Sequence, residues 1–457
     1  MIPDVVADLR ATFDSGRTKP FTWREAQLEG LDRLLAENGA ELEAALAADL
    51  GKSATEAYLT EIGFLRTELA HVRARFRRWL APQRVPVPLS LRPARASIIR
   101  EPLGVVLVIA PWNYPVQLTF GPLIGALAAG NTALLKPSEL TPTVSATIAR
   151  LVPRYLDGVA VVEGGPEETG EVLAQRFDHI VYTGGSRVAR IVMRAAAEHL
   201  TPVTLELGGK SPAWVDGTTD LRTAARRLAW GKFLNAGQTC VAPDYVLAPP
   251  DVARRLEPLL AEAVADMYGP DPRNSPDYGR IISAHHHARV VELLEGSVAA
   301  GARVVTGGEH DGEAYLAPTV LADVGLDSPA MAEEIFGPVL PLVAVDGIAE
   351  AVAVIRAGEK PLALYAFTED ARTRRTLLRE TSSGAVVFGA PAVHLAVPSL
   401  PFGGVGGSGM GSYHGEHSVR TLSHPKPVLR KPSSPDTLAL IRPPFTGLKE
   451  RLARRLM

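Results

Sequence analysis

The chain has 457 residues with a single cysteine, and its 48 basic and 50 acidic residues leave a net charge of −2. This length predicts about two large domains or three smaller ones. One cysteine excludes an internal disulfide and fits a reducing compartment such as the cytoplasm, while the near-neutral charge argues against a nucleic-acid-binding protein.

The first part of the chain is predicted to be helical. From Trp23 to about Leu80, leucines recur at the spacing of amphipathic helices, with few residues that break a helix. The following segment, 81–100, holds four prolines among Val, Leu and Arg. This composition predicts an extended excursion or hairpin that leaves the main body.

The stretch from Pro102 to Leu135 carries no charged residue and is long enough to span a bilayer. It also contains four prolines, and a lipid-exposed helix would leave the backbone groups that they free without hydrogen bonds. We therefore predict a buried strand, a loop, a helix and a second strand in the protein core.

From Glu101 onward, short β-rich runs alternate with helical segments, which predicts an α/β fold with a mostly parallel sheet. Strands are expected first at 104–110, 132–135, 159–162 and 179–182, and after Gly208 at 213–215, 245–247, 339–345 and 363–367. Helices are expected at 220–233, 251–267 and 287–300.

The single thiol, Cys240, follows Ala236-Gly237 and precedes Pro243. These residues end a helix and oppose its continuation, which predicts a turn with free backbone N–H groups. The thiolate is the reactive form of cysteine, and such donors or a neighbouring base favour it. The alternative is that Cys240 is a small buried hydrophobic residue.

Glu206 lies between two leucines and is followed by a pair of glycines. A carboxylate at such an apolar strand end has a raised pKa and is suited to act as a general base. Glu206 also follows the turn at 184–186 at the distance expected of a ribose-binding acid. Spacing alone does not choose between these roles, and pairing with Lys210 is a third interpretation.

Two loops that follow predicted strands carry polar side chains. In the first loop, between Pro111 and Pro115, the amide of Asn113 is suited to stabilise an oxyanion. In the second, Lys136 and Glu139 end a strand where a nucleotide ribose can bind. The alternative for both is an ordinary loop.

The run of three histidines at 285–287 lies near the start of a predicted helix. Neighbouring positions on a helix point in different directions, and no second set of ligands has a suitable spacing. We interpret the run as a solvated helix face and predict no metal.

Together these motifs resemble the aldehyde dehydrogenase superfamily, most closely its class 3 branch of fatty and aromatic aldehyde dehydrogenases. The resemblance runs from about residue 23 to about residue 430, with its strongest stretches at 101–140, 199–212, 230–245, 277–283, 333–341 and 400–415. It implies a Rossmann-type NAD(P)-binding domain, a catalytic α/β domain, a small oligomerisation flap and a basic C-terminal tail. The NAD(P)-binding domain is expected at 1–80 and 101–207, and the catalytic domain at 208–419. The oligomerisation flap is expected at 81–100 and 420–431, and the basic tail at 432–457.

The resemblance implies that Cys240 attacks the aldehyde carbon, and that Asn113 and the Cys240 N–H hold the resulting oxyanion. Hydride transfer to NAD or NADP then leaves a thioester, and the resemblance makes Glu206 the base that activates water to hydrolyse it. The cofactor contacts that it implies are Lys136, Glu139, Gly184, Gly185, Ser186, Glu334 and Phe336.

The implied function is oxidation of a medium-chain, long-chain or aromatic aldehyde to its carboxylic acid by a cytoplasmic homodimer. A CoA-acylating dehydrogenase and a catalytically silent binding or structural protein are the alternatives. The chain departs from the family pattern in the cofactor turn, at Gly185, Arg187 and Ala189, and at Gly389-Ala390, which we expect near the substrate wall.

The basic tail carries Leu448, Leu452 and Leu456 at helical spacing, beside several Lys and Arg residues. This stretch is too short to span a membrane. A solvated basic helix or a disordered segment is the preferred interpretation, and association with a membrane surface is the alternative.

Overall fold

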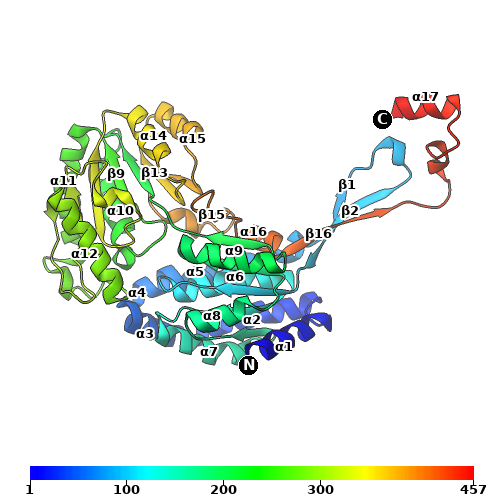
Figure 1. The fold of residues 1–457 in the computed structure, drawn as a ribbon, viewed down its shortest axis with the longest axis horizontal. Coiled ribbons are helices and arrows are strands. Elements are labelled where there is room, and N and C mark those ends of the chain that lie inside the picture. The colour runs from blue at the N-terminus through cyan, green and yellow to red at the C-terminus, as the bar shows by residue number, and fades with distance from the viewer. Residues whose placement is uncertain (457) are drawn as a thin grey trace.

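The computed structural model describes residues 1–456 and arranges them around three β-sheets (Figure 1). Two sheets form the body of the molecule and are mostly parallel, with helices packed on them. The third sheet is a narrow antiparallel ribbon that projects from the body. The α/β fold predicted from the sequence is therefore confirmed.

The first sheet has the strand order β15-β7-β6-β3-β4-β5, in which only β15 runs antiparallel to its neighbour. All four strands predicted for this part of the chain are present. The strands are β3 (Val105–Ile109), β4 (Thr132–Lys136), β5 (Val159–Val161), β6 (His179–Thr183), β7 (Val203–Glu206) and β15 (Gly409–Met410).

The helices of this part follow the predicted periodicity, and a π-helical turn, η1 (Tyr58–Ile62), precedes α5. They are α1 (Ile2–Asp14), α2 (Phe21–Glu37), α3 (Gly39–Leu50), α4 (Ala54–Ala57), α5 (Gly63–Trp79), α6 (Pro115–Ala129), α7 (Pro142–Tyr155), α8 (Pro166–Leu173), α9 (Ser186–Glu198) and α16 (Gly415–Thr421).

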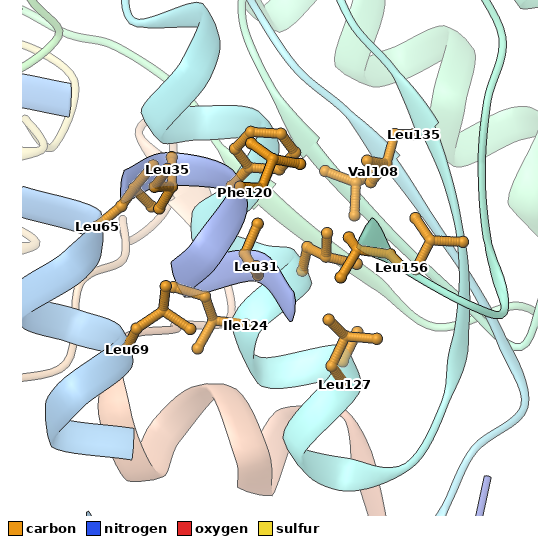
Figure 2. Packing of buried hydrophobic residues seen from close by; sticks show 14 of the residues in the cluster. Leu31, Leu35, Leu65, Leu69, Val108, Phe120, Ile124, Leu127, Leu135 and Leu156 are labelled. Carbon is orange, nitrogen blue, oxygen red and sulfur yellow. The ribbon is translucent and has the colours of Figure 1, made fainter. Parts of the chain in front are cut away.

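Helix α6 lies at the centre of this part of the molecule, and every one of its residues is buried. Figure 2 shows its side chains Phe120, Ile124 and Leu127 packed between leucines of α2 and α5 and strand residues such as Val108. A helix that is apolar on all sides is stable only when other elements surround it. The uncharged stretch is thus core, as predicted.

The second sheet has the order β10-β11-β12-β9-β8-β13-β14, and only β10 is antiparallel. Every strand and helix predicted after Gly208 is present. The strands are β8 (Pro212–Val215), β9 (Tyr245–Ala248), β10 (Arg303–Thr306), β11 (Thr319–Ala322), β12 (Val339–Ala344), β13 (Ala363–Phe367) and β14 (Ala385–Phe388). The helices are α10 (Leu221–Phe233), α11 (Pro250–Tyr268), α12 (Ala284–Ala299), α13 (Pro329–Ala332), α14 (Ile348–Ala357) and α15 (Ala371–Glu380).

The chain then returns to the first sheet. Strand β15 pairs with β7, and α16 packs on α6, where Gly125 allows a close approach because a Cβ there would lie 2.4 Å from Ser418. Strand β15 and most of α16 fall within the range 208–419 of the expected catalytic domain, although both elements pack with the first sheet.

The third sheet consists of β1 (Gln83–Val85), β2 (Arg95–Pro102) and β16 (Ser423–Arg430), with β2 in the middle. The predicted hairpin at 81–100 is therefore present. Beyond β16 the tail ends in α17 (Gly447–Leu456), which lies beside the ribbon in Figure 1. Leu448 is exposed, whereas the side chains of Leu452 and Leu456 lie outside the described part of the structure.

Across residues 1–456, none of the helices has both the length and the apolar character that crossing a membrane requires.

Candidate active site

The candidate site lies where three neighbouring parallel strands end. Strands β7, β6 and β3 are adjacent in the first sheet, and their carboxyl ends carry Glu206, the Gly184 turn and the Asn113 loop. Ligands of open α/β sheets bind at this edge. A cavity of about 1100 Å³ opens there, and its lining includes Asn113, Gly184, Gly185, Ser186, Glu206, Cys240, Glu334 and Phe336.

Cys240 reaches this cavity from the second sheet through a strained turn. After α10, Asn235 and Ala236 have φ values of 52° and 51°, and Gly237 has 75°. Gly237 is required for a second reason, because a Cβ there would lie 2.2 Å from the carbonyl oxygen of Gly337. The predicted turn is present, and it presents the partly exposed thiol to the cavity.

The ionisation of Cys240 is opposed by its surroundings. Burial, with smaller contributions from the nearby Glu334 and Glu206 carboxyl groups, raises the pKa of the thiol to about 12. The backbone N–H groups of Cys240 and Val241 lower the pKa, as expected of the turn, but their effect is smaller. At neutral pH the group is therefore a thiol, and forming the thiolate requires a base.

Glu206 is the last residue of β7 and only 2% exposed. Burial raises its pKa well above the usual range, and neither carboxyl oxygen has a hydrogen-bond partner within residues 1–456. Lys210 does not pair with it, because the Lys210 ammonium bonds to Asp244. The interpretation of Glu206 as the partner of Lys210 is thus wrong.

Asn113 is held against the Cys240 turn. Its Nδ2 donates to the carbonyl of Gln238 at 3.0 Å, and its own carbonyl accepts from Asn235 Nδ2 at 2.8 Å. An amide nitrogen carries two hydrogens, so one N–H is left for a group bound in the cavity. The loop and the turn, which are far apart in the sequence, therefore form one rigid unit.

A buried ion pair supports this unit, and no pattern in the sequence indicated it. Lys52 and Glu61 have fully buried side chains, with Nζ and Oε1 2.6 Å apart. Lys52 also donates to the Asn113 carbonyl at 2.9 Å, and Glu61 Oε2 accepts the N–H groups of Val116 and Gln117 at the start of α6. A charged residue within a helical pattern normally faces solvent, so periodicity does not distinguish these two from surface residues.

The turn after β6 faces the same cavity. Gly184 has φ 155°, and a Cβ there would lie 2.4 Å from the Tyr182 hydroxyl oxygen. Gly185 precedes α9, and a Cβ on it would meet no atom within 4 Å, so the position has space for a side chain. Arg187 is exposed and lines the cavity, whereas Ala189 is buried in the core of α9.

Lys136 and Glu139 lie at the end of β4, one strand beyond β3. Lys136 is buried and lies 4.0 Å from a Glu139 carboxylate oxygen, and neither residue lines the cavity. The departure at Gly389-Ala390 also lies outside the cavity lining. There the Arg227 guanidinium donates to the Gly389 carbonyl at 2.7 Å.

Glu334 and Phe336 enter the cavity from the second sheet. The Glu334 carboxylate lies over Gly208, where a Cβ would be 2.0 Å from an oxygen. Burial and the Asp244 charge raise the pKa of Glu334 to about 8, against opposing effects of the Gly209 N–H and two lysines. Phe336 packs edge-on against Trp112 with ring centroids 5.4 Å apart.

The histidine run begins α12, but within it only His285 is exposed to solvent, so the run as a whole is not a solvated face. His287 is 2% exposed and hydrogen-bonds through Nε2 to the Tyr315 carbonyl, and His286 packs on Trp112. That part of the sequence interpretation is wrong, because the first turn of α12 packs against the neighbouring loops. Within the described residues, no group of three or more His, Cys, Asp or Glu side chains is arranged to hold a metal ion.

Comparisons with known proteins agree with this arrangement. The model of the aldehyde dehydrogenase family matches residues 2–428. Human aldehyde dehydrogenase family 3 member B1 is 48% identical over 453 residues, which cover 98% of this chain and 96% of the relative. The dimeric NADP-preferring aldehyde dehydrogenase of Canis lupus familiaris is 46% identical, over 94% of this chain and 95% of that protein.

Solved structures show the same fold. Staphylococcus aureus AldH in its substrate-bound state superposes with a TM-score of 0.96 at 42% identity, over the whole of both chains. A variant of the P. syringae indole-3-acetaldehyde dehydrogenase AldA, in complex with NAD+, superposes with 0.86 at 27% identity, over 94% and 89% of the two chains. The chain belongs to the aldehyde dehydrogenase family and is therefore an NAD(P)-dependent enzyme that oxidises aldehydes.

Proposed function

We propose that this enzyme oxidises medium-chain, long-chain or aromatic aldehydes to carboxylic acids through a covalent intermediate on Cys240. The observation that carries the proposal is the convergence of Cys240, Glu206 and Asn113 on one cavity that two separate sheets enclose. The substrate class rests on the similarity to family 3 aldehyde dehydrogenases.

In the proposed mechanism, Glu206 is the buried base that the high pKa of Cys240 demands. A thiolate at Cys240 attacks the aldehyde carbon, and the resulting oxyanion accepts the free Asn113 N–H and the Cys240 backbone N–H. Glu206 then releases the thiol proton to solvent, and after oxidation it takes a proton from water while the water oxygen attacks the thioester. The C–S bond breaks, and the carboxylic acid leaves.

The cavity suits a dinucleotide, which accepts the hydride of the oxidation step when it is bound. The N-terminus of α9 at Gly185 and Ser186 is open to the cavity, and helix N-termini attract phosphate groups. We propose that Gly184, Gly185 and Ser186 lie beside the pyrophosphate, and that Glu334 and Phe336 hold the nicotinamide ribose and ring. Lys136 and Glu139 would hold the adenosine ribose.

NAD and NADP both fit the chain's charges. Glu139 is suited to accept the ribose hydroxyls, whereas Lys136 and the exposed Arg187 are suited to offset its repulsion of a 2′-phosphate. The canine relative is named as NADP-preferring and the P. syringae structure holds NAD+.

We propose a homodimer, as the name of the dimeric canine relative suggests. A cytoplasmic location is proposed because a chain with a single cysteine fits a reducing compartment. The ribbon formed by 81–100 and 420–431 would be the oligomerisation flap, and 432–457 a basic tail. Residues 1–80 and 101–207 would form the cofactor domain and 208–419 the catalytic domain. β15 and α16, which pack with the first sheet, would link the two.

An aldehyde panel tests the proposal. Purified enzyme is incubated with short, long and aromatic aldehydes and with NAD or NADP, and both the reduced cofactor and the acid are measured. Long or aromatic substrates should give the highest kcat/KM. A requirement for CoA, with an acyl-CoA product instead of the free acid, would contradict the proposed hydrolysis and favour a CoA-acylating enzyme.

A further inference from the structure

Glu56 is a buried carboxyl group that the mechanism above does not use. It lies in the short helix α4 and is 8% exposed. Its Oε1 accepts the backbone N–H of Asn235 at 2.9 Å, although the two residues are 179 positions apart in the sequence. Asn235 is the first residue of the left-handed turn that leads to Cys240. Glu56 therefore contacts the backbone of the turn that presents the proposed nucleophile.

The turn needs an acceptor at this point because helix α10 has ended. The N–H of Leu234 still donates to a helix carbonyl, that of Trp230. The next N–H, that of Asn235, donates to the Glu56 carboxyl group instead. Non-glycine residues with positive φ are strained and persist only where the surroundings fix them. Asn235 and Ala236 are both such residues, so the hydrogen bond to Glu56 stabilises a conformation that the chain by itself disfavours.

Other polar groups fix the opposite end of the turn. Tyr114 Oη and Thr239 Oγ1 form a hydrogen bond and are 2.6 Å apart. The Gln238 side chain forms hydrogen bonds of 2.9 Å with backbone groups of the segment 280–282. These contacts hold the residues directly before the thiol, whereas Glu56 holds the backbone where the turn begins. The two ends of the turn are thus fixed by separate elements.

We propose that Glu56 is a positioning residue, which holds the turn in the conformation that directs the Cys240 thiol and backbone N–H toward the aldehyde. This inference rests on the proposed function. Glu56 does not line the cavity, so it acts through the turn and not on the substrate.

The conformation of the turn matters because it sets where the Cys240 N–H points. A donor stabilises an oxyanion only when it is directed at the position where the charge develops. A misplacement of about 1 Å in such a site can cost about 100-fold in rate. Loss of the hydrogen bond from Asn235 to Glu56 is therefore expected to slow the attack on the aldehyde and to leave the cofactor contacts unchanged.

Glu68 supplies a matched control for Glu56. It is 5% exposed, and its Oε1 accepts one backbone N–H, that of Gly415. Burial raises the pKa of Glu56 and of Glu68 to about 7. The two carboxyl groups are similar in burial, in the kind of partner and in ionisation. They differ in whether the partner belongs to the turn that carries Cys240.

The test measures the first turnover separately from cofactor binding. Stopped-flow absorbance at saturating aldehyde and cofactor gives the rate constant of the first NAD(P)H formed, and fluorescence titration gives the Kd of the cofactor. Glu56→Leu should slow the first turnover roughly 10- to 100-fold without changing that Kd. Glu68→Leu should keep the wild-type rate constant. Both variants leave one buried N–H without an acceptor, so both should lower the thermal unfolding temperature by a similar amount.

Glu56→Gln separates positioning from general damage. The glutamine carbonyl oxygen can still accept the Asn235 N–H, so this variant should recover most of the wild-type rate constant. A wild-type rate in Glu56→Leu, an equal loss of rate in Glu68→Leu, or no recovery in Glu56→Gln would overturn the role of Glu56 while the proposed function stands. Undiminished aldehyde oxidation by Cys240→Ala would contradict the proposed function and this inference together.

Discussion

The Lys52–Glu61 ion pair that holds the Asn113 loop and the region around Glu206 are both buried. They differ in whether their polar atoms have hydrogen-bond partners. In the first region, Lys52 and Glu61 are fully buried, and each charge meets partners on the loop and on α6. In the second, neither carboxyl oxygen of Glu206 has a partner in residues 1–456. A satisfied network fixes geometry, whereas unsatisfied buried groups are costly unless they bind something. The comparison therefore separates the part that holds the site in place from the part that reacts.

The largest effect is expected from Cys240→Ala, which removes the proposed nucleophile. Aldehyde oxidation should fall by about 10⁴-fold or more, while NAD(P) binding, measured by fluorescence titration, stays at the wild-type affinity. The side chain is small and only partly buried, so the thermal unfolding temperature should change little. Substantial aldehyde-dependent NAD(P)H formation by the variant would rule out a covalent mechanism at this residue.

Glu206→Gln keeps the shape of the reacting region and removes its base. Hydrolysis should slow by roughly 10²- to 10⁴-fold. Stopped-flow absorbance should then show a burst of reduced cofactor followed by a low steady rate, if hydride transfer stays fast relative to hydrolysis, with the acyl-enzyme detectable by mass spectrometry. A uniform loss of cofactor affinity without a burst would instead favour a role for Glu206 in binding ribose.

Lys52→Met tests the supporting region. It leaves Glu61 buried without its ion-pair partner, and breaking a buried pair in this way costs about 3–5 kcal/mol. Denaturant unfolding should show this loss, together with reduced kcat because Asn113 loses its anchor. The exposed pair of Arg150 and Glu41 supplies the control, since Arg150→Met should cost at most about 1 kcal/mol. Equal losses in both variants would contradict the supporting role of the buried pair.

The smallest effect concerns pH and Glu68, whose Oε1 accepts the Gly415 N–H at the start of α16. Burial raises the pKa of Glu68 to about 7 from the ordinary 4.5. The folded state therefore binds the proton more tightly, so the stability that this group contributes is present below pH 4.5 and is lost as the pH rises through 7. Glu68→Gln mimics the neutral acid.

Calorimetry should therefore show that the wild-type unfolding temperature falls between pH 5 and 7.5 by roughly 1–2 °C more than that of Glu68→Gln. Glu56, whose pKa burial also raises to about 7, is common to both proteins and cancels in the comparison. Parallel curves for the two proteins would show that Glu68 titrates normally.

The sequence by itself determined most of the architecture of this protein. The strands at 104–110 and 132–135 and the helix between them follow from a run of residues that is uncharged, rich in proline and apolar. Such patterns are local, since a strand or helix that must bury one face displays that need along its own sequence. The turn before Cys240 was also predictable, because Ala236-Gly237 and Pro243 act on their own neighbourhood.

Only the tertiary structure decided which side chains meet. Glu61 and Glu206 are both buried carboxyl groups, yet one caps α6 and pairs with Lys52 while the other has no partner in the described structure. His287, expected in solvent, is buried against Tyr315. Gly409 comes to lie opposite Glu206 only through the pairing of β15 with β7. A residue's type and spacing do not specify contacts made across long stretches of chain, because folding sets which groups lose their water and which partners replace it.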